Sequence, residues 1–365
     1  MIRRLKRTAK RLLAIRAVRS AYNGVTRALL ALGGSSRLGA TLYAAVGFAT
    51  HNREQYAVLS GRRAYYRNLG RFRASHVELR RNIHRLEKGI LMRPRRRTFA
   101  RDYIEETLDF YRDALKRPAD FPGTDVGEVR WAFGVLSEYF SIVSDDDAGI
   151  ARARATFDAL EAPDLDADLH PYPARELAET TITYDQILDL ALSRRSVRWF
   201  LDKPVPRDLI DKALIVARQS PSACNRLPYE FLVFDEPEQA RRVAAIPFGA
   251  AGYAHQIPTV IVVKGELSSY FSPRDRHVPY IDASLAAMAF MFALRTLGLS
   301  ASVINWPDFE PQEAKISRVL GLKPHERIIM LMAVGYADPE GEVASSEKKS
   351  LDVLRRFNTL DVQRP

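Results

Sequence analysis

Apolar residues recur every three to four positions in four stretches between residues 74 and 163, which is the period of an amphipathic helix. The stretches read RASHVELRRNIHRLEKGI, RDYIEETLDFYRDALKRP, VGEVRWAFGVLSEYFSIV and AGIARARATFDALEAP. Pro118 and Pro163 stop the second and the fourth, because proline does not continue a helix. RPRRRTF, between the first two, is too basic and too broken by proline to be helical. The pattern therefore predicts an all-helical region.

The pattern changes after APDLDADLHPYPARE at 162–176, where three prolines and several acids indicate a linker. Two further helical segments follow, TYDQILDLALSRR and PVPRDLIDKALIVARQS. Four apolar runs of strand length then occur: YEFLVFD, PTVIVVKG, SASVINW and RIIMLMAVGY. Helices and strands mix without strict alternation, which favours an α+β fold over a doubly wound sheet.

The expected organisation has four parts. Residues 1–70 form a basic amphipathic arm, 71–162 a helical region, 163–180 a linker, and 181–365 the α+β domain. Within that domain, residues 283–294 are apolar on every side of a helix between Asp282 and Arg295. Twelve residues are too few to cross a bilayer. This helix is therefore expected to be surrounded by protein, either in the core or at a dimer interface.

Composition places the chain among globular proteins, since 365 residues with 47% hydrophobic content suffice for a core. The single cysteine, Cys224, excludes a disulfide framework and a cysteine-based zinc site, and it argues for a reducing, cytoplasmic environment. The seven histidines lack metal-ligand spacing, so no metal is expected. No nucleophile elbow, zinc-protease pair, Walker loop or dinucleotide fingerprint is present, and no catalytic triad is expected.

Charge is unevenly distributed along a chain whose formal net charge is +11. Residues 1–101 hold 25 Lys and Arg against three acids, whereas residues 102–365 hold 30 against 41. Such a basic segment favours contact with a nucleic acid, an anionic membrane surface or an acidic polymer. The alternative is a solvated, Arg-rich helical face.

The first 20 residues include eight basic residues and an apolar series at helical spacing: Ile2, Leu5, Ala9, Leu12 and Ile15. This pattern is typical of a helix that lies in a membrane interface. Arg16 and Arg19 interrupt the apolar stretch that a signal peptide requires. The apolar run 38–50 is also shorter than the roughly 20 residues that a membrane-spanning helix needs.

We therefore expect residues 1–50 to contact an anionic membrane or polymer peripherally, at the inner face of the membrane. The arm carries no nucleic-acid-binding motif and no aromatic residue before Tyr22, which argues against nucleic acid.

Three separated clusters suggest one anionic ligand. SRRSVRWF places forked guanidinium groups and a hydroxyl within five residues, which suits a phosphate, although basic residues at a helix C-terminus also complement the helix dipole. SPSACN is a rigid polar loop in which Pro221 fixes φ and Ser222 and Asn225 can bond backbone or ligand; a plain turn is the alternative. SEKKSLD adds Lys348 and Lys349, for which a solvated tail is the alternative.

In this order, the clusters resemble the FMN-dependent nitroreductase family over residues 181–355. The family's RRSxRxF stretch matches RRSVRWF, its P-V-x-x-x-x-[LI] helix matches PVPRDLI, and its APSxxNxQPW loop matches SPSACNRLPYEF. MAVGYADP and EKKS match the closing strand and basic tail. The resemblance implies a central, mostly antiparallel sheet flanked by helices, preceded here by the all-helical N-terminal region.

The resemblance also implies FMN as cofactor, NAD(P)H as co-substrate and a ping-pong transfer of hydride to a small-molecule acceptor. It implies an intertwined homodimer with FMN between subunits, which would explain the apolar helix 283–294. In that case Cys224 lies in the flavin-binding loop without acting as a nucleophile. The implied cofactor-binding residues are Arg194, Arg195, Ser196, Arg198, Pro221, Ser222, Ala223, Asn225, Ser302, Val303, Ile304, Lys348 and Lys349.

Departures from the family pattern leave the substrate open. Leu227 stands where the family usually has Gln, and Tyr229 where it often has Trp. IHRLEKG at 83–89 resembles the N-terminal region of nitroreductase-like proteins of bacterial polysaccharide-biosynthesis loci. Two other interpretations remain open, namely a flavin-binding or flavin-modifying protein without NAD(P)H turnover, and a membrane-surface or acidic-polymer interaction module carried by the arm.

Overall fold

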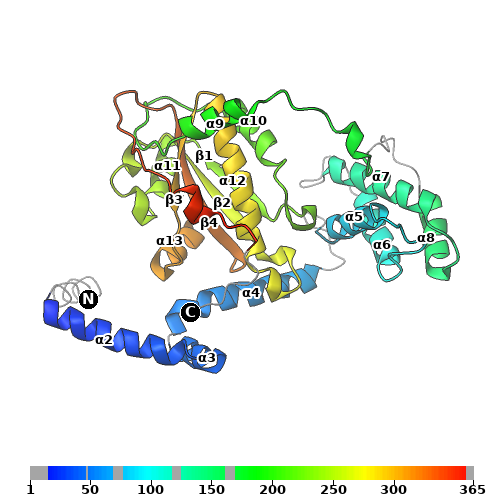
Figure 1. Ribbon diagram of the computed structural model, residues 1–365, viewed down its shortest axis with the longest axis horizontal. Coiled ribbons are helices and arrows are strands. Elements are labelled where there is room, and N and C mark those ends of the chain that lie inside the picture. Colours follow the sequence, from blue (N-terminus) through cyan, green and yellow to red (C-terminus); the bar gives the residue numbers. More distant parts are fainter. Residues whose placement is uncertain (1–14, 47, 69–76, 117–124, 161–168, 359–365) are drawn as a thin grey trace. The chain divides into compact units, whose positions relative to one another are not determined.

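The computed structural model describes residues 15–46, 48–68, 77–116, 125–160 and 169–358 (Figure 1). Two compact units make up the chain, residues 1–60 and residues 61–365. The predicted boundaries of the arm, helical region and linker stay predictions. The predicted interfacial helix lies outside the described residues, apart from its last member, Ile15.

The N-terminal unit contains α2 (Arg16–Gly33), α3 (Arg37–Val46) and the first part of α4 (Phe48–Asn68). α2 and α3 contact each other across a short turn, yet α2 buries no residue. The apolar side chains of α2 recur on one face and are exposed: Val18, Tyr22, Val25, Leu29 and Leu32. Amphipathic patterning therefore continues beyond the predicted helix, with its apolar face uncovered in this unit.

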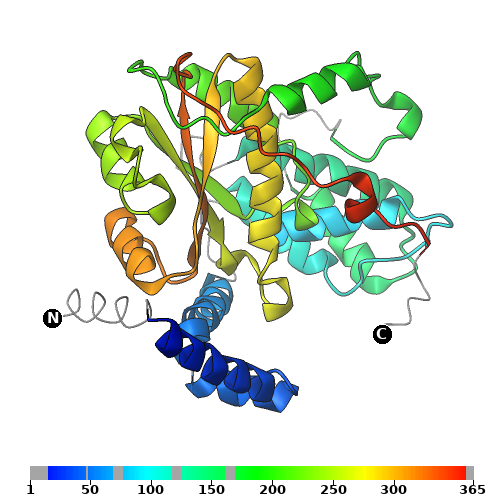
Figure 2. The ribbon, with the colours of Figure 1, turned by 60° about the vertical axis from the view of Figure 1, so that its left-hand side comes forward.

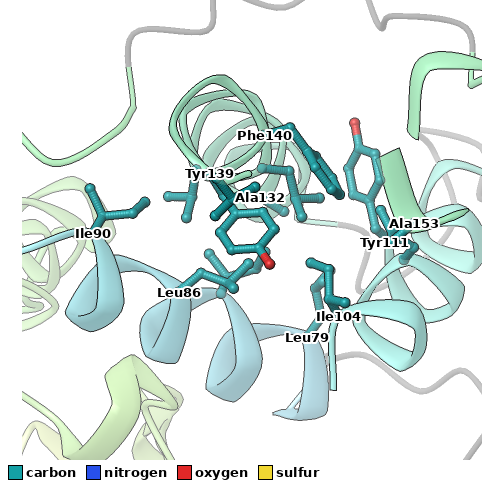
Figure 3. Packing of buried hydrophobic residues seen from close by; sticks show 14 of the residues in the cluster. Leu79, Leu86, Ile90, Ile104, Tyr111, Ala132, Tyr139, Phe140 and Ala153 are labelled. Atoms are coloured by element: carbon teal, nitrogen blue, oxygen red, sulfur yellow. The ribbon is translucent and has the colours of Figure 1, made fainter. Parts of the chain in front are cut away.

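The four predicted helices of the helical region are confirmed as α5 (Val77–Ile90), α6 (Ile104–Leu115), α7 (Val126–Ile142) and α8 (Ala148–Asp158). RPRRRTF forms no helix, as expected. The side chains of Asp125 and Asp147 cap the N-termini of α7 and α8 by accepting backbone N–H bonds. Figure 3 shows the core between the helices, which includes Leu79, Leu86, Ile104, Tyr111 and Tyr139.

The α+β prediction is also confirmed. The four apolar runs form β1 (Tyr229–Phe234), β2 (Thr259–Glu266), β3 (Ser300–Asn305) and β4 (Glu326–Gly335). They pair in the order β1-β2-β4-β3, and every pair is antiparallel. A register shift between Val263 and Lys264 interrupts the β2–β4 ladder.

Helices cover both faces of this sheet (Figure 2). α11 (Pro237–Ala244) and α13 (Glu310–Leu320) pack with one apolar cluster, whereas α10 (Arg207–Ala217) and α12 (Val278–Thr296) pack with the other. α9 (Tyr184–Ser193) contacts α12, and the short α14 (Leu351–Leu354) follows β4. Because both faces are covered, β2 and β4 read as nearly continuous apolar runs rather than alternating ones.

The helix predicted to be surrounded by protein is α12, and within one chain it is covered on one face only. Ala283, Ala286 and Phe290 are buried, whereas Ile281 and Leu285 are 56% and 45% exposed. Residues 273–296 are the one segment of the described chain that is long and apolar enough to cross a membrane, and 44% of its most apolar window is buried. A core helix with one uncovered apolar face explains both observations.

Candidate functional site

The RRSVRWF segment leaves the end of α9 and runs beside β3. The backbone becomes extended at Arg194. Ser196 forms a parallel bridge with Ala301, and the Val197 N–H donates to the Ala301 carbonyl at 3.2 Å. The segment therefore lies against the strand that carries the predicted SVI residues.

Gln256 holds the far end of this segment. Its side-chain oxygen accepts from the Phe200 N–H at 2.9 Å, and its amide nitrogen donates to the Arg198 carbonyl. The Leu201 N–H donates to the Tyr336 carbonyl at 2.9 Å. The backbone of the motif is thus fixed, while the Arg198 side chain points outward and is exposed.

The C-terminal tail returns to the same segment. The Arg195 guanidinium, which is half-buried, donates to the Ser345 carbonyl at 3.3 Å. Lys348 and Lys349 lie three and four residues further along and are exposed. The structure therefore brings the tail to the first motif, and it leaves both lysine side chains accessible to a ligand.

The three predicted residues of β3 differ in environment. Ile304 is buried in the core, Val303 is 40% exposed, and Ser302 is buried with no hydrogen-bond partner on its hydroxyl. A buried hydroxyl without a partner is uncommon in folded proteins and points to a missing contact. Ser302 directly follows Ala301, which bridges Ser196 of the first motif, so its hydroxyl is a fitting contact for a polar ligand.

The SPSACN loop has a strained backbone held by its own hydrogen bonds. Cys224, Asn225 and Leu227 have φ of 56°, 50° and 47°, which is the left-handed region. The Leu227 N–H donates to Ser222 Oγ at 2.8 Å, and the Asn225 N–H donates to the Ser222 carbonyl at 2.9 Å. Such strain persists only where the surroundings enforce it, which is typical of ligand-binding loops.

Asp282, the fifth residue of α12, anchors this loop through two hydrogen bonds. Its carboxylate accepts from the Ala223 N–H at 2.9 Å and from the Ser222 hydroxyl. Burial raises the pKa of Asp282, while the bonds from Ala223 and Ser222 and the charge of Arg226 oppose that rise. The Asp282 carboxylate therefore acts as a fixed hydrogen-bond acceptor for the loop.

Arg80 of α5 holds the loop from the other side. Its Nε donates to the Asn225 carbonyl at 2.6 Å, and its guanidinium pairs with Glu128 of α7 at 3.1 Å. Both side chains are nearly buried. The helical region thus contacts the predicted flavin loop directly, through a hydrogen bond from an arginine that is itself held by a buried ion pair.

The predicted ligands fall into two groups at opposite ends of α12. Asp282 holds the SPSACN loop near the first turn, and Arg295 in the last turn donates to Ser193 at 3.4 Å, next to the first motif. Thirteen residues of helix separate these anchors by roughly 20 Å. Figure 1 shows α9 at one end of α12. In one chain, the loop and the RRSVRWF segment therefore do not meet around a single ring system.

Three positioning residues were missed in the sequence: Asp282, Gln256 and Arg80. A lone acid heading an all-apolar helical run was a usable signal for Asp282, because a carboxylate is rarely buried without a partner. Gln256 and Arg80 carry no comparable signal, since the segments that they hold lie far away in the sequence and are bound through backbone carbonyls or N–H groups.

A cavity of about 390 Å³ lies at the end of the sheet beyond the loop, and none of the predicted cofactor residues lines it. Leu227, Glu230, Lys264 and His325 are among its lining residues. Lys264 pairs with Glu230 at 2.7 Å, so charge is compensated there by the protein itself. Among the residues that the structure describes, no group of His, Cys, Asp and Glu side chains is arranged to hold a metal ion.

Comparison with known proteins finds a family that part of this chain matches. A model of the nitroreductase family matches residues 191–251 and 245–336. Human iodotyrosine deiodinase 1 is 23% identical over 211 residues, which cover 50% of this chain and 71% of that protein. An NADH dehydrogenase of Thermus thermophilus is 26% identical over 194 residues, covering 45% of this chain and 92% of that one.

Among solved structures, an FMN-dependent nitroreductase from Clostridium difficile is 22% identical, with a TM-score of 0.41, and is matched over 47% of this chain and 98% of its own. A nitroreductase from Desulfovibrio desulfuricans in complex with FMN is also 22% identical at a TM-score of 0.41, over 50% of this chain and 99% of its own. The family model spans both predicted ligand motifs, the sheet and α12. The C-terminal half of the chain therefore contains a match to the nitroreductase family, over residues 191–336.

Proposed function

We propose that this protein is an FMN-dependent oxidoreductase that takes hydride from NAD(P)H and gives it to a small-molecule acceptor. The observation that carries the proposal is the placement of two preorganised ligand groups at the ends of α12, beside uncovered apolar surface. FMN, when bound, supplies the hydride chemistry in a ping-pong sequence, so the protein needs only to bind, orient and tune it.

The residues present suit such a cofactor. Arg194 and Arg195 offer forked donors for a phosphate, and the exposed Lys348 and Lys349 add charge where the tail returns. The buried, unpartnered hydroxyl of Ser302 provides a polar contact beside them. No general acid or base is required among these residues.

The second ligand group, Pro221, Ser222, Ala223 and Asn225, would come from a partner subunit. The roughly 20 Å along α12 between Asp282 and Arg295, which anchor the two groups, supports this. The exposed apolar residues of α12 and α9 supply a surface for that partner: Ile281, Leu285, Met288, Ile187, Leu188 and Leu192. The proposal therefore includes a homodimer with one flavin site at each end of the shared interface.

A second candidate function is reductive dehalogenation of an aromatic compound on the same cofactor. Its support is the similarity to iodotyrosine deiodinase 1 over half of this chain. The similarity to the Thermus NADH dehydrogenase supports the nicotinamide-dependent alternative over a comparable span. The two candidates differ in whether NADH or NADPH reduces the flavin at a useful rate.

The proposal also gives the N-terminal unit a peripheral role at the inner face of the membrane. α2 presents an uncovered apolar face, and residues 1–53 contain no acid, so contact with an anionic lipid surface is favourable. The IHRLEKG resemblance supports an acceptor from cell-surface polysaccharide synthesis.

The test is an absorbance spectrum of the purified full chain, followed by anaerobic addition of NADH or NADPH. We expect a flavin band near one FMN per chain that bleaches with one of the nucleotides. A colourless protein that does not take up added FMN would contradict the oxidoreductase function. Bound flavin that resists both nucleotides, with turnover of iodotyrosine under dithionite, would instead support dehalogenation.

A further inference from the structure

Arginine side chains converge where α5 meets the SPSACN loop. Arg226 lies over the Tyr270 ring at 4.8 Å, and Arg81 lies over the neighbouring Phe271 ring at 5.2 Å. Arg80 directly precedes Arg81, and Asn225 directly precedes Arg226. The hydrogen bond from Arg80 to the Asn225 carbonyl therefore fixes the two segments against each other. Arg81 and Arg226 therefore face the same pair of aromatic residues.

Arg85, one helical turn after Arg81, extends the cluster. Its guanidinium lies 3.5 Å from the centre of the Tyr103 ring. Arg81 and Arg85 donate to the same neutral oxygen, Oδ1 of Asn82, at 3.4 and 3.2 Å. One amide oxygen thus serves two guanidinium groups, which leaves most of their N–H donors available for a ligand.

No carboxylate among the described residues forms an ion pair with Arg81, Arg85 or Arg226, in contrast to Arg80. Arg226 is only 6% exposed, and its Nε has no acceptor. Asp282 is near enough to feel the charge of Arg226, but it already accepts from Ala223 and Ser222.

Burial of an unpaired guanidinium is costly, and a bound anion offsets that cost. The pKa of Arg81 reflects this crowding: burial lowers it first, and the charges of Arg85 and Arg226 lower it further. An uncompensated cluster of this kind differs from an Arg-rich solvated face, where water would satisfy each side chain.

We infer that Arg81, Arg85 and Arg226 form a binding site for a carboxylate or phosphate group carried by the acceptor. The forked donors suit either group, and the Tyr103 and Phe271 rings bound the site. The assignment to the acceptor rests on the proposed function, because it requires the adjacent SPSACN loop to border the flavin. Anion binding itself does not require it.

The first experiment measures the thermal midpoint of the FMN-loaded full chain in phosphate and in chloride at equal ionic strength and pH 7.5. Loading with FMN keeps phosphate out of the flavin site. If the purified chain holds no flavin, the same comparison is made in an Arg194→Gln background, which removes a phosphate donor from that site. We expect phosphate to raise the midpoint by about 4 °C at 100 times its Kd. Arg81→Gln and Arg226→Gln should each remove most of that rise, whereas Arg93→Gln, on the exposed RPRRRTF loop, should keep it.

The site is refuted if phosphate has no more effect than chloride, or if both variants keep the full rise. Arg81→Gln is the variant less prone to misfold, since Arg81 is only half-buried whereas Arg226 is buried. This experiment needs no turnover, so it separates failure of the anion site from failure of the oxidoreductase function.

The second experiment asks whether the anion belongs to the acceptor. The KM values for 4-nitrobenzoate and for neutral 4-nitrobenzyl alcohol are compared in the wild type and in Arg81→Gln. We expect the substitution to raise KM for the benzoate about tenfold with kcat unchanged, and to change KM for the alcohol less than twofold. If phosphate stabilises the protein but Arg81→Gln changes KM equally for the two substrates, the site binds a free anion. That outcome would overturn its link to the acceptor.

Discussion

Individual buried polar residues hold the predicted flavin loop, and Asp282 is the most consequential of them. Its carboxylate accepts from the Ala223 N–H and the Ser222 hydroxyl beneath a loop with three left-handed residues. Truncation to alanine would leave both donors unsatisfied in a buried position, which costs about 2 kcal/mol. We expect Asp282→Ala to lower the free energy of unfolding in urea by this amount and to weaken flavin retention.

Asp282→Asn is the matched control, since its amide oxygen can still accept one bond. It should lose less than half as much stability as the alanine variant. Equal losses in both variants would mean that the negative charge, rather than the acceptor geometry, stabilises the loop.

A second residue-scale prediction concerns His325, which is buried before β4. Burial lowers its pKa first; Lys323 and Arg67 lower it further, and Glu266 and Glu326 oppose them. The folded state therefore favours the neutral ring, and stability present above about pH 6.5 is lost as the pH falls through the folded pKa.

Urea unfolding at pH 7.5 and pH 5.5 tests this directly. The wild type should lose more free energy of unfolding between these pH values than His325→Gln, whose side chain does not titrate. An identical loss in the two proteins would rule out His325 as a source of the pH dependence.

The sequence pointed to the residues that contact a ligand better than to those that position them. Arg194, Ser222 and Asn225 could be selected because their chemistry suits a phosphate or a polar loop and because they stand in a motif. Arg80 and Gln256 act on distant backbone carbonyls, and no local pattern reports such a partner.

At the scale of elements, helices and strands followed from periodicity and from prolines. Their bounds differ from the predicted stretches by only a few residues, because the apolar face of each helix is the face that becomes buried. Strand order did not follow in the same way: β4 lies between β2 and β3, and this depends on contacts between residues far apart in the chain. The all-apolar sequence of α12 likewise did not indicate that only one of its faces is buried within one chain.

The IHRLEKG stretch allows an element-scale prediction, because Gly89 near the end of α5 faces the edge of the Phe99 ring. A Cβ at this position would overlap that ring, which packs edge-on against Tyr139 at 5.0 Å. Helix propensity alone predicts that Gly89→Ala adds about 1 kcal/mol of stability. The steric overlap outweighs it, because overpacking a core costs about 1–3 kcal/mol.

We therefore expect Gly89→Ala to destabilise the protein in urea, despite the better helix former. Gly252→Ala is the control, since a Cβ there meets no atom within 4 Å. A stabilised Gly89→Ala variant would show that Phe99 moves aside without cost.

At the scale of the molecule, α12 connects the proposed flavin chemistry to assembly. One face of the helix packs on the sheet, Asp282 near its N-terminus holds the SPSACN loop, and its last turn lies beside the RRSVRWF segment. The other face is apolar and uncovered. A second copy related by a two-fold axis would cover that face and bring the loop of one chain to the segment of the other.

This arrangement predicts that flavin binding and dimerisation fail together. Leu285 is 45% exposed at the middle of the uncovered face, so Leu285→Glu would place a charge in a desolvated interface without disturbing the core of one chain. We expect light scattering to give a dimer for the wild type and a monomer for this variant, with FMN affinity at least tenfold lower because half of the ligands are lost. Leu91→Glu, at a 56% exposed position after α5, should remain a dimer with flavin. A monomeric Leu285→Glu protein that keeps full flavin affinity would mean that one chain holds the cofactor alone, and the separation of the two ligand groups along α12 would then need another explanation.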